Sequence, residues 1–311
     1  MPDLERNETI LRTERLIQLI WNVEPGALHW WKALALRVVR TPWLLGRELI
    51  EGQLSMLATL CLILALSGCA TVPETGRSQL RLISAEQEMR LGLVEFNKLK
   101  QTTPVSRDTT LQAQLQKVGR RIAAVAPLAG AQWEFVLFDR PDEANAFCLP
   151  GGKVGVYSGI LPVTRDENGL ATVIGHEVAH AVARHGAERA SEQLLMQAGG
   201  QALDVVMASR APQWRGAVLG AYGIGGELGV VLPHSRTQEL EADRLGLLYM
   251  ARAGYDPRKA VAFWQRFGAY QTKLGGGRPI EFLSTHPLDQ TRIRALEDFM
   301  PQALAEYGKN R

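Results

Sequence analysis

Apolar side chains recur at helical spacing between residues 170 and 181, which predicts a helix with one buried face. The members of this stripe are Leu170, Val173, Ile174, Val178 and Ala181. Glu177 falls where the stripe requires another apolar residue, so the pattern places a carboxylate on the buried face. A buried carboxylate needs a partner, and this helix is therefore the first candidate for a functional element.

Four further stretches have the pattern of regular elements. Helical periodicity covers residues 84–100 and 109–125, whereas residues 133–138 and 153–157 are rich in strand formers. A Pro-Gly-Gly turn precedes the second strand, so the sequence predicts a hairpin just before the helix with the buried carboxylate. An exposed strand edge there would bind an extended peptide by adding it to the sheet; the alternative is that these strands only close the core.

Residues 199–232 are rich in glycine and alanine and end in a nearly apolar run of sixteen residues, Ala217 to Leu232. Sixteen residues are short for a membrane span. We expect small-residue helices that either pack beside the functional site or form a mobile cover, and the glycines permit both arrangements.

An almost entirely apolar run of thirteen residues extends from Leu54 to Leu66, too short to span a bilayer but suited to the core of a signal peptide. It leads into Ser-Gly-Cys, which resembles the bacterial lipobox and implies cleavage before Cys69 and acylation of its thiol. The alternative is a buried apolar helix that ends in Gly-Cys by chance.

These features divide the chain into four parts. Residues 1–53 are a doubtful extension that suggests a start codon assigned too early, and residues 54–69 are the lipoprotein signal. The polar residues 70–78 are predicted to form a short tether, and residues 79–308 the functional domain.

Composition excludes some classes of function. The chain has 311 residues, 46% of them hydrophobic and 22% charged, with a formal net charge of +3, which is typical of a globular protein. It contains no basic run, so we expect no nucleic-acid partner. Cys61 and Cys69 belong to the predicted signal, which leaves Cys148 without a disulfide partner, as a small core residue.

The helix with the buried carboxylate carries two histidines at metal-binding spacing. His176 and His180 are four residues apart, so both can aim a ring nitrogen at a single ion. Glu177 stands beside this pair, where a carboxylate can take a proton from a zinc-bound water. The pattern His-Glu-x-x-His is typical of metalloproteases, and it predicts one Zn2+ per chain.

A catalytic zinc needs a third protein ligand, for which Glu239 is the best candidate. Asp243 lies four residues later on the same predicted helix face, where it would accept a hydrogen bond from a ligating histidine, whereas Glu241 points away. His185 is half a turn out of phase with His176 on a continuous helix, so we expect it to face away from the metal. His234, close to the Glu239 helix, stays open as an outer group around the metal.

Four separated motifs occur in order along the chain: residues 145–152, the His-Glu-x-x-His helix, the Glu-x-Glu-Ala-Asp helix, and residues 284–287. Together they resemble a zinc metallopeptidase family that includes the CAAX prenyl protease. The resemblance is to the bacterial periplasmic relatives of that protease and of the mitochondrial inner-membrane stress protease, including the beta-barrel assembly-enhancing type. It covers about residues 80–300.

The resemblance implies zinc ligands His176, His180 and Glu239, with Glu177 as general base. His286 matches the family's His-Pro segment, and Arg292 matches the arginine six residues after it, placed to stabilise an oxyanion. The resemblance also implies an α+β fold, mainly helical: a gluzincin-type zincin with a small antiparallel sheet beside the zinc helix. We assign the substrate edge of that sheet to Asn145, Ala146, Phe147, Pro150, Gly151 and Gly152.

We therefore interpret residues 79–308 as a zinc metallopeptidase domain that cleaves misfolded or stalled envelope proteins. One rival is a chaperone-like outer-membrane assembly factor with a mostly latent protease site. Another is a structural-zinc module, which would have no use for the base Glu177. Because Ala70 and Thr71 provide no aspartate beside the lipidated Cys69, the predicted location is the periplasmic face of the outer membrane, with the lipid as the membrane anchor.

His286 has two alternative roles on this interpretation. Pro287 keeps it in a loop, so its imidazole could reach the open zinc position and switch the enzyme off, or turn aside and stabilise the intermediate. A plain alternative is a histidine that caps the next helix near Asp289.

Overall fold

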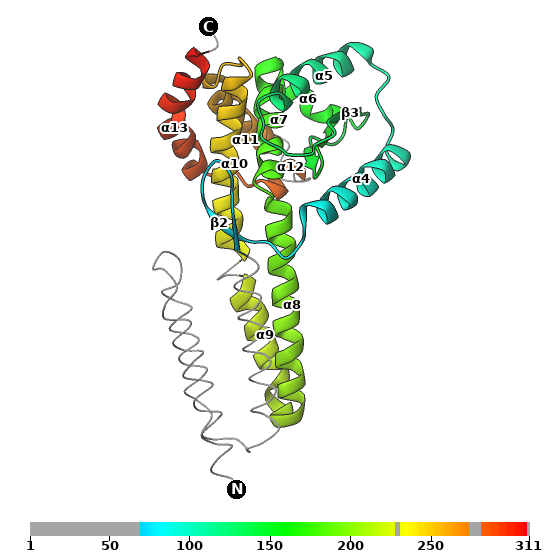
Figure 1. Ribbon diagram of the computed structural model, residues 1–311, viewed down its shortest axis with the longest axis vertical. Helices are drawn as coiled ribbons and strands as arrows, with labels where there is room; N and C mark the ends of the chain where they lie inside the picture. Colours follow the sequence, from blue (N-terminus) through cyan, green and yellow to red (C-terminus); the bar gives the residue numbers. More distant parts are fainter. Residues whose placement is uncertain (1–68, 228–230, 274–280, 310–311) are drawn as a thin grey trace. The chain divides into compact units, whose positions relative to one another are not determined.

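The computed structural model describes residues 69–227, 231–273 and 281–309 (Figure 1). Helices make up most of this part of the chain, which confirms the mainly helical prediction. The helices are α4 (Ala85–Thr102), α5 (Thr109–Ala123), α6 (Leu161–Thr164), α7 (Glu167–Val182), α8 (His185–Arg210), α9 (Arg215–Gly226), α10 (Leu232–Arg252), α11 (Arg258–Lys273), α12 (Glu281–Thr285) and α13 (Gln290–Gly308). The strands are β1 (Cys69–Thr71), β2 (Ser78–Leu80), β3 (Glu134–Phe138), β4 (Ala146–Leu149) and β5 (Lys153–Tyr157).

Helix α7 lies in the middle of the hydrophobic core, where it contacts α5, α10, α11 and β4 (Figure 1). Only Glu167, Asn168 and Ala181 of its residues are partly exposed, and the rest are buried. Asp166 begins the helix, because its side chain accepts a hydrogen bond from the backbone N–H of Gly169 at 2.9 Å. A helix buried on nearly every side is held rigidly by its neighbours, which suits an element that positions ligands.

The larger sheet has the strand order β3-β5-β4 and is mixed. β3 pairs with β5 in parallel, and β4 pairs with β5 antiparallel across the Pro-Gly-Gly turn. The two strands predicted from composition, β3 and β5, are therefore not a hairpin, and the hairpin at the Pro-Gly-Gly turn is β4–β5. The prediction of a wholly antiparallel sheet is corrected as well. The chain from Phe138 to Lys153 is long enough for a crossover, and it contains β4.

Strand β4 lies at one edge of this sheet, as predicted for the segment from Asn145 to Gly152. It also packs against α7. The other face of the sheet is covered by α4 through an aromatic cluster of Phe96, Phe138, Phe147 and Tyr157. The cluster fixes the sheet, and hence the edge strand, relative to the central helix.

Residues 70–78 are part of the fold, which corrects the predicted tether. β1 and β2 form an antiparallel hairpin with Thr71 opposite Ser78, and Val72 is fully buried in the main core. Polar composition suggested a linker, but one apolar side chain and two charged partners suffice to hold the turn in place. The predicted extension 1–53 and the apolar run from Leu54 to Leu66 lie outside the described residues.

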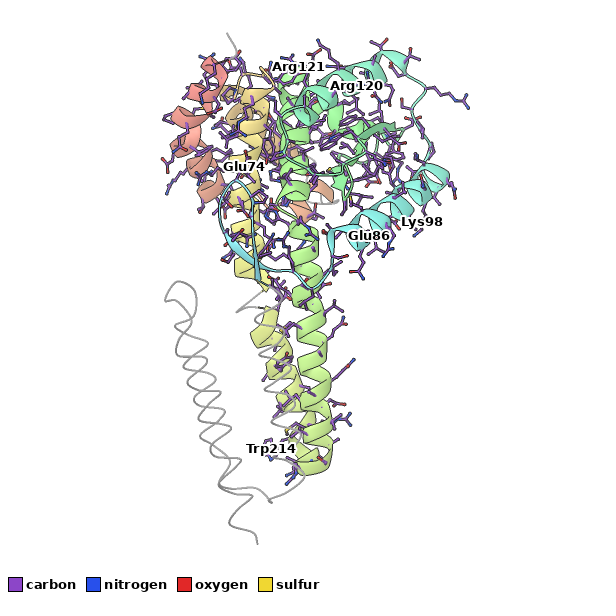
Figure 2. All side chains as sticks on the ribbon, viewed as in Figure 1. Glu74, Glu86, Lys98, Arg120, Arg121 and Trp214 are labelled. Carbon is purple, nitrogen blue, oxygen red and sulfur yellow. The ribbon has the colours of Figure 1, made fainter. Side chains whose placement is uncertain are left out.

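The glycine- and alanine-rich stretch forms helices, as expected. α9 packs against α8, where the Tyr222 hydroxyl donates to the carbonyl of Met196 at 3.2 Å and Arg215 pairs with Asp204 at 2.5 Å. Trp214, at the turn between the two helices, is 62% exposed (Figure 2). Among the helices in the described part of the chain, none combines the length and the apolar character needed to cross a membrane.

Candidate metal centre

Helix α7 presents His176, Glu177 and His180 on successive positions of its buried surface. The Nε2 atoms of the two histidines lie 3.1 Å apart and face the same point. This is the geometry expected of an i, i+4 pair that shares one ion. The spacing in the sequence is therefore realised in the fold.

Helix α10 brings the predicted third ligand to the same point. Glu239 Oε2 lies 3.4 Å from His176 Nε2, and Glu239 Oε1 lies 3.3 Å from His180 Nε2. One turn later, Asp243 Oδ1 is 3.0 Å from His176 Nδ1, the ring nitrogen that faces away from the cluster. Asp243 is thus placed to orient His176, as a carboxylate does behind a metal-binding imidazole.

His286 is the fourth member of the group, and it follows directly after the short helix α12. Its backbone N–H donates to the carbonyl of Phe282 at 2.8 Å, which fixes the backbone. Its Nδ1 lies 3.3 Å from His176 Nε2 and 3.0 Å from Glu239 Oε1, while its Nε2 lies 3.4 Å from Glu177 Oε1. The structure therefore places His286 between the proposed ligands and the proposed base.

The four donor groups fit a zinc ion. Zinc bound tetrahedrally at roughly 2.0–2.1 Å holds its ligand atoms about 3.3–3.4 Å from one another, by the geometry of a tetrahedron. The separations given above run from 3.0 to 3.4 Å, and all four groups are within 4.8 Å of one another. The two nitrogens from α7, the carboxylate of Glu239 and the nitrogen of His286 are the donor types that zinc prefers.

The charges of the cluster also suit a cation. Burial opposes ionisation of Glu239, but hydrogen bonds from His176, His180 and His286 outweigh it and hold the pKa of this carboxyl far below its usual range. Burial lowers the pKa of His176, but Asp243 and Glu239 outweigh it and raise this pKa to about 9. The carboxylates around the histidines thus favour positive charge at this point.

Glu177 has the properties of a general base. Burial raises the pKa of its carboxyl, an effect that the nearby His286 and His176 partly oppose. A raised pKa lets a carboxylate both take a proton and return it near neutral pH. Apart from the approach of His286, Glu177 Oε1 has no hydrogen-bond partner among the described residues, and so it is available to a substrate water.

Arg292 is fully engaged by protein groups. Its guanidinium binds both oxygens of Asp243 at 2.7 and 2.8 Å and lies 3.0 Å from Glu239 Oε2. It also donates to the backbone carbonyls of His286 and Pro287, and it stacks on Trp264 at 4.6 Å from the ring centre. Arg292 therefore joins α10, α13 and the His286 segment behind the ligands.

The edge strand β4 packs against α7, the helix that carries the proposed base Glu177. Burial raises the pKa of the Cys148 thiol in β4, and the negative charge of Glu177 raises it further. Cys148 packs against the main core, in agreement with the role predicted for it. The raised pKa disfavours the thiolate, which is the reactive form.

His185 does not face away from the metal centre, and that prediction is wrong. The α7 helix ends at Val182, and Arg184 adopts a left-handed conformation with φ of 57°. The break turns the chain so that His185 Nδ1 lies 2.8 Å from His180 Nδ1. The prediction assumed one continuous helix, and no glycine or proline at 183 or 184 signals the break.

The profile of Peptidase family M48 matches residues 109–300. The chain belongs to this family. It is 34% identical over 237 residues to the mitochondrial metalloendopeptidase OMA1 of Schizosaccharomyces pombe, an alignment that covers 75% of this chain and 66% of that protein. With the human mitochondrial metalloendopeptidase OMA1 the identity is 30% over 297 residues, 90% of this chain and 55% of the relative.

A bacterial relative matches over a smaller share of both proteins. The beta-barrel assembly-enhancing protease of Escherichia coli is 30% identical over 227 residues, 72% of this chain and 46% of that protein. The matched region thus spans between about half and two thirds of these relatives. Family M48 metallopeptidases use zinc, which agrees with the donor set formed by His176, His180, Glu239 and His286.

These similarities correct the predicted location. The relatives that match with 34 to 38% identity are mitochondrial metalloendopeptidases, whereas the beta-barrel assembly-enhancing proteases match at 29 to 30%. The prediction that the protein lies at the periplasmic face of the outer membrane is therefore contradicted. It gave too much weight to the two small residues before Cys69 and to one branch of the family.

Proposed function

We propose that this protein is a zinc-dependent endopeptidase that hydrolyses peptide bonds in unfolded or misassembled proteins. The observation that carries the proposal is the position of Glu177. It is buried on the same helix as His176 and His180, and it lies beside the donor cluster without being one of its ligands. A structural zinc site has no need for a base at this point.

The residues divide the work of hydrolysis among them. His176, His180 and Glu239 would hold zinc, which when bound polarises a carbonyl and acidifies a water molecule. Glu177 takes the proton of the attacking water and delivers it to the leaving amine. Asp243 and Arg292 keep His176 and the His286 segment in position.

His286 is better placed than Arg292 to meet the substrate. Its Nε2 lies 3.4 Å from Glu177, on the side of the cluster where the base acts. The Arg292 donors are already bound to Asp243, Glu239 and two backbone carbonyls, so little remains for an oxyanion. We therefore assign transition-state support to His286 when it is turned away from the ligands.

We further propose that the substrate binds as an added strand. β4 ends the β3-β5-β4 sheet and packs against α7, the helix that carries Glu177. A peptide paired with its outer edge would bind through backbone groups with little regard for sequence. Only an extended segment can do so, which selects unfolded chains over folded ones. The outer membrane was first inferred as the place of these substrates, and this inference is withdrawn because the predicted location is contradicted.

A second candidate function is a chaperone-like assembly factor whose protease site is mostly latent. The position of His286 favours it, because a nitrogen that completes the donor set would occupy the position that a catalytic water needs. The two candidates share one site and differ in how often His286 leaves it.

The test of the proposal uses purified protein loaded with zinc, an unfolded polypeptide such as reduced casein, and mass analysis of the fragments. We expect internal cleavage that stops with a chelator and with Glu177→Gln, but not with Glu95→Gln, an exposed glutamate on α4. The other outcome is that neither protein cleaves the unfolded polypeptide, while both the unaltered protein and Glu177→Gln prevent its aggregation. The chaperone-like function then replaces the endopeptidase.

The lipid anchor at Cys69 also stays a proposal. Cleavage before Cys69 would leave β1 complete, because the strand begins at this residue. The intact mass of protein isolated from its native cells tests the proposal. An acylated mature form that begins at Cys69 supports it, and a peptide that joins residues 1–68 to the domain overturns it.

A further inference from the structure

The two histidines of α7 are supported in different ways. His176 has the carboxylate of Asp243 directly behind it, at 3.0 Å. His180 has an imidazole instead, because its Nδ1 faces His185 Nδ1 at 2.8 Å, with the ring centres 4.8 Å apart. The Nε2 of His185 in turn lies 2.9 Å from Glu241 Oε2. We propose that His185 is a positioning residue of the metal centre, which links His180 to the carboxylate of Glu241.

The positions of the protons between His180, His185 and Glu241 follow from the groups at the two ends of this series. An imidazole that offers its Nε2 lone pair to a metal carries its proton on Nδ1, so His180 donates and His185 Nδ1 accepts. His185 must then carry its own proton on Nε2, and it donates that proton to Glu241. The metal-binding role of His180 and the carboxylate of Glu241 require the same tautomer of each ring. The resulting hydrogen bonds fix the orientation of His180.

Glu241, at the far end of this hydrogen-bonded series, is itself held by other residues. Arg77 donates from Nε to Glu241 Oε2 at 2.8 Å, and the hydroxyl of Thr75 donates to Oε1. Arg77 also holds both oxygens of Glu188 at 2.6 and 2.7 Å. Thr75 and Arg77 belong to the turn between β1 and β2. The network thus connects the first hairpin of the domain to a ligand on α7.

The network is buried, which favours a positioning role for His185 over an incidental contact at the surface. His185 is fully buried, and Glu188 and Glu241 are 2% and 7% exposed. Hydrogen bonds of this kind in a dry environment are strong and directional. Their loss would leave a ligating imidazole free to rotate, and outer groups of this type change metal affinity without touching the metal.

The test measures metal binding, and it rests on the proposed zinc site. His185→Phe keeps a ring but has neither acceptor nor donor, so we expect zinc affinity, measured by competition with a chelating dye, to fall about 10- to 100-fold. The visible spectrum of the Co2+-loaded protein should change as well. His185→Gln can accept from His180 and donate to Glu241, and it should recover part of the loss.

Ser191→Ala is the matched control. Ser191 is fully buried on the same helix and bonds Leu82 and Ala187, but it does not touch His180. Its zinc affinity and Co2+ spectrum should match those of the unaltered protein. If His185→Phe does not fold, Glu241→Gln replaces it, and a weakened zinc affinity is again the expected result.

The outcomes separate this proposal from the proposed function. Unaltered protein that fails to bind zinc contradicts the endopeptidase. Unaltered protein that binds zinc, together with a His185→Phe or Glu241→Gln protein of equal affinity and spectrum, leaves the endopeptidase standing and overturns the positioning role.

Discussion

Gly175 and Gly246 bring α7 and α10 into backbone contact beside the first metal ligand. A Cβ atom at Gly175 would lie 2.9 Å from the carbonyl oxygen of Gly246, and one at Gly246 would lie 3.0 Å from the backbone nitrogen of His176. No side chain separates the two helices here. This approach lets the donors of Glu239 and Asp243 reach those of His176 and His180.

We predict that Gly175→Ala lowers both stability and zinc affinity. The added methyl group would meet backbone in a packed core and force the helices apart, which typically costs about 1–3 kcal/mol. Chemical denaturation with and without zinc measures both effects. Gly216→Ala in α9, where an added Cβ meets nothing within 4 Å, is the control and should not destabilise. An alanine at 175 that leaves both quantities unchanged contradicts the close approach.

For His286→Ala we predict faster basal cleavage of unfolded substrate with unchanged zinc content. The reason is that His286 Nδ1 completes the donor set, so its removal should open the position of the attacking water. Peptidase assays paired with metal analysis on the same sample decide the matter. Loss of cleavage at full zinc content would mean that the transition-state role of His286 outweighs its blocking of the water position, and would contradict the switch.

Arg292→Met should destabilise the fold by about 3–5 kcal/mol, because it removes the guanidinium that neutralises the buried carboxylate of Asp243. Denaturant unfolding gives the value. The exposed pair of Arg90 with Glu86 on α4 provides the control, and Arg90→Met should be close to neutral. Full stability with lost cleavage would mean that Arg292 acts on the substrate, as the sequence interpretation had it.

Metal removal should lower the melting temperature. Glu239 and its neighbours hold negative charge in a buried place, and a bound cation stabilises only the folded state, by about 2.7 kcal/mol when free zinc is 100 times its Kd. Thermal unfolding in chelator and in zinc measures this difference. The Glu239→Gln protein should show a much smaller difference, and an equal one would remove Glu239 from the ligand set.

The parts of the centre that residue spacing alone predicts share one property: each pair lies on a single helix. The spacing of His176 and His180, and that of Glu239 and Asp243, is a matter of helical geometry, and it needs no knowledge of the tertiary fold. The chemistry of these residue types then points to zinc. Mainly helical architecture follows from the same periodicity.

What the sequence did not predict depends on backbone conformation or on long-range pairing. The left-handed Arg184 moves His185 towards His180, although arginine rarely adopts that conformation. The parallel pairing of β3 with β5 joins strands that the chain separates by β4, and strand composition carries no sign of direction. The turn with Arg77 resembled a linker because its partners Glu188 and Glu241 lie over a hundred residues away.

Arg292 has a consequence for the order of events during synthesis. The segment that contains Asp243 and Glu239 leaves the ribosome well before the residue that neutralises and orients it. Until translation has passed Arg292, two buried carboxylates lack their cation and His286 lacks the guanidinium that holds its carbonyl. The buried carboxylates of Asp243 and Glu239 therefore gain their counter-charge only when α13 packs onto α10.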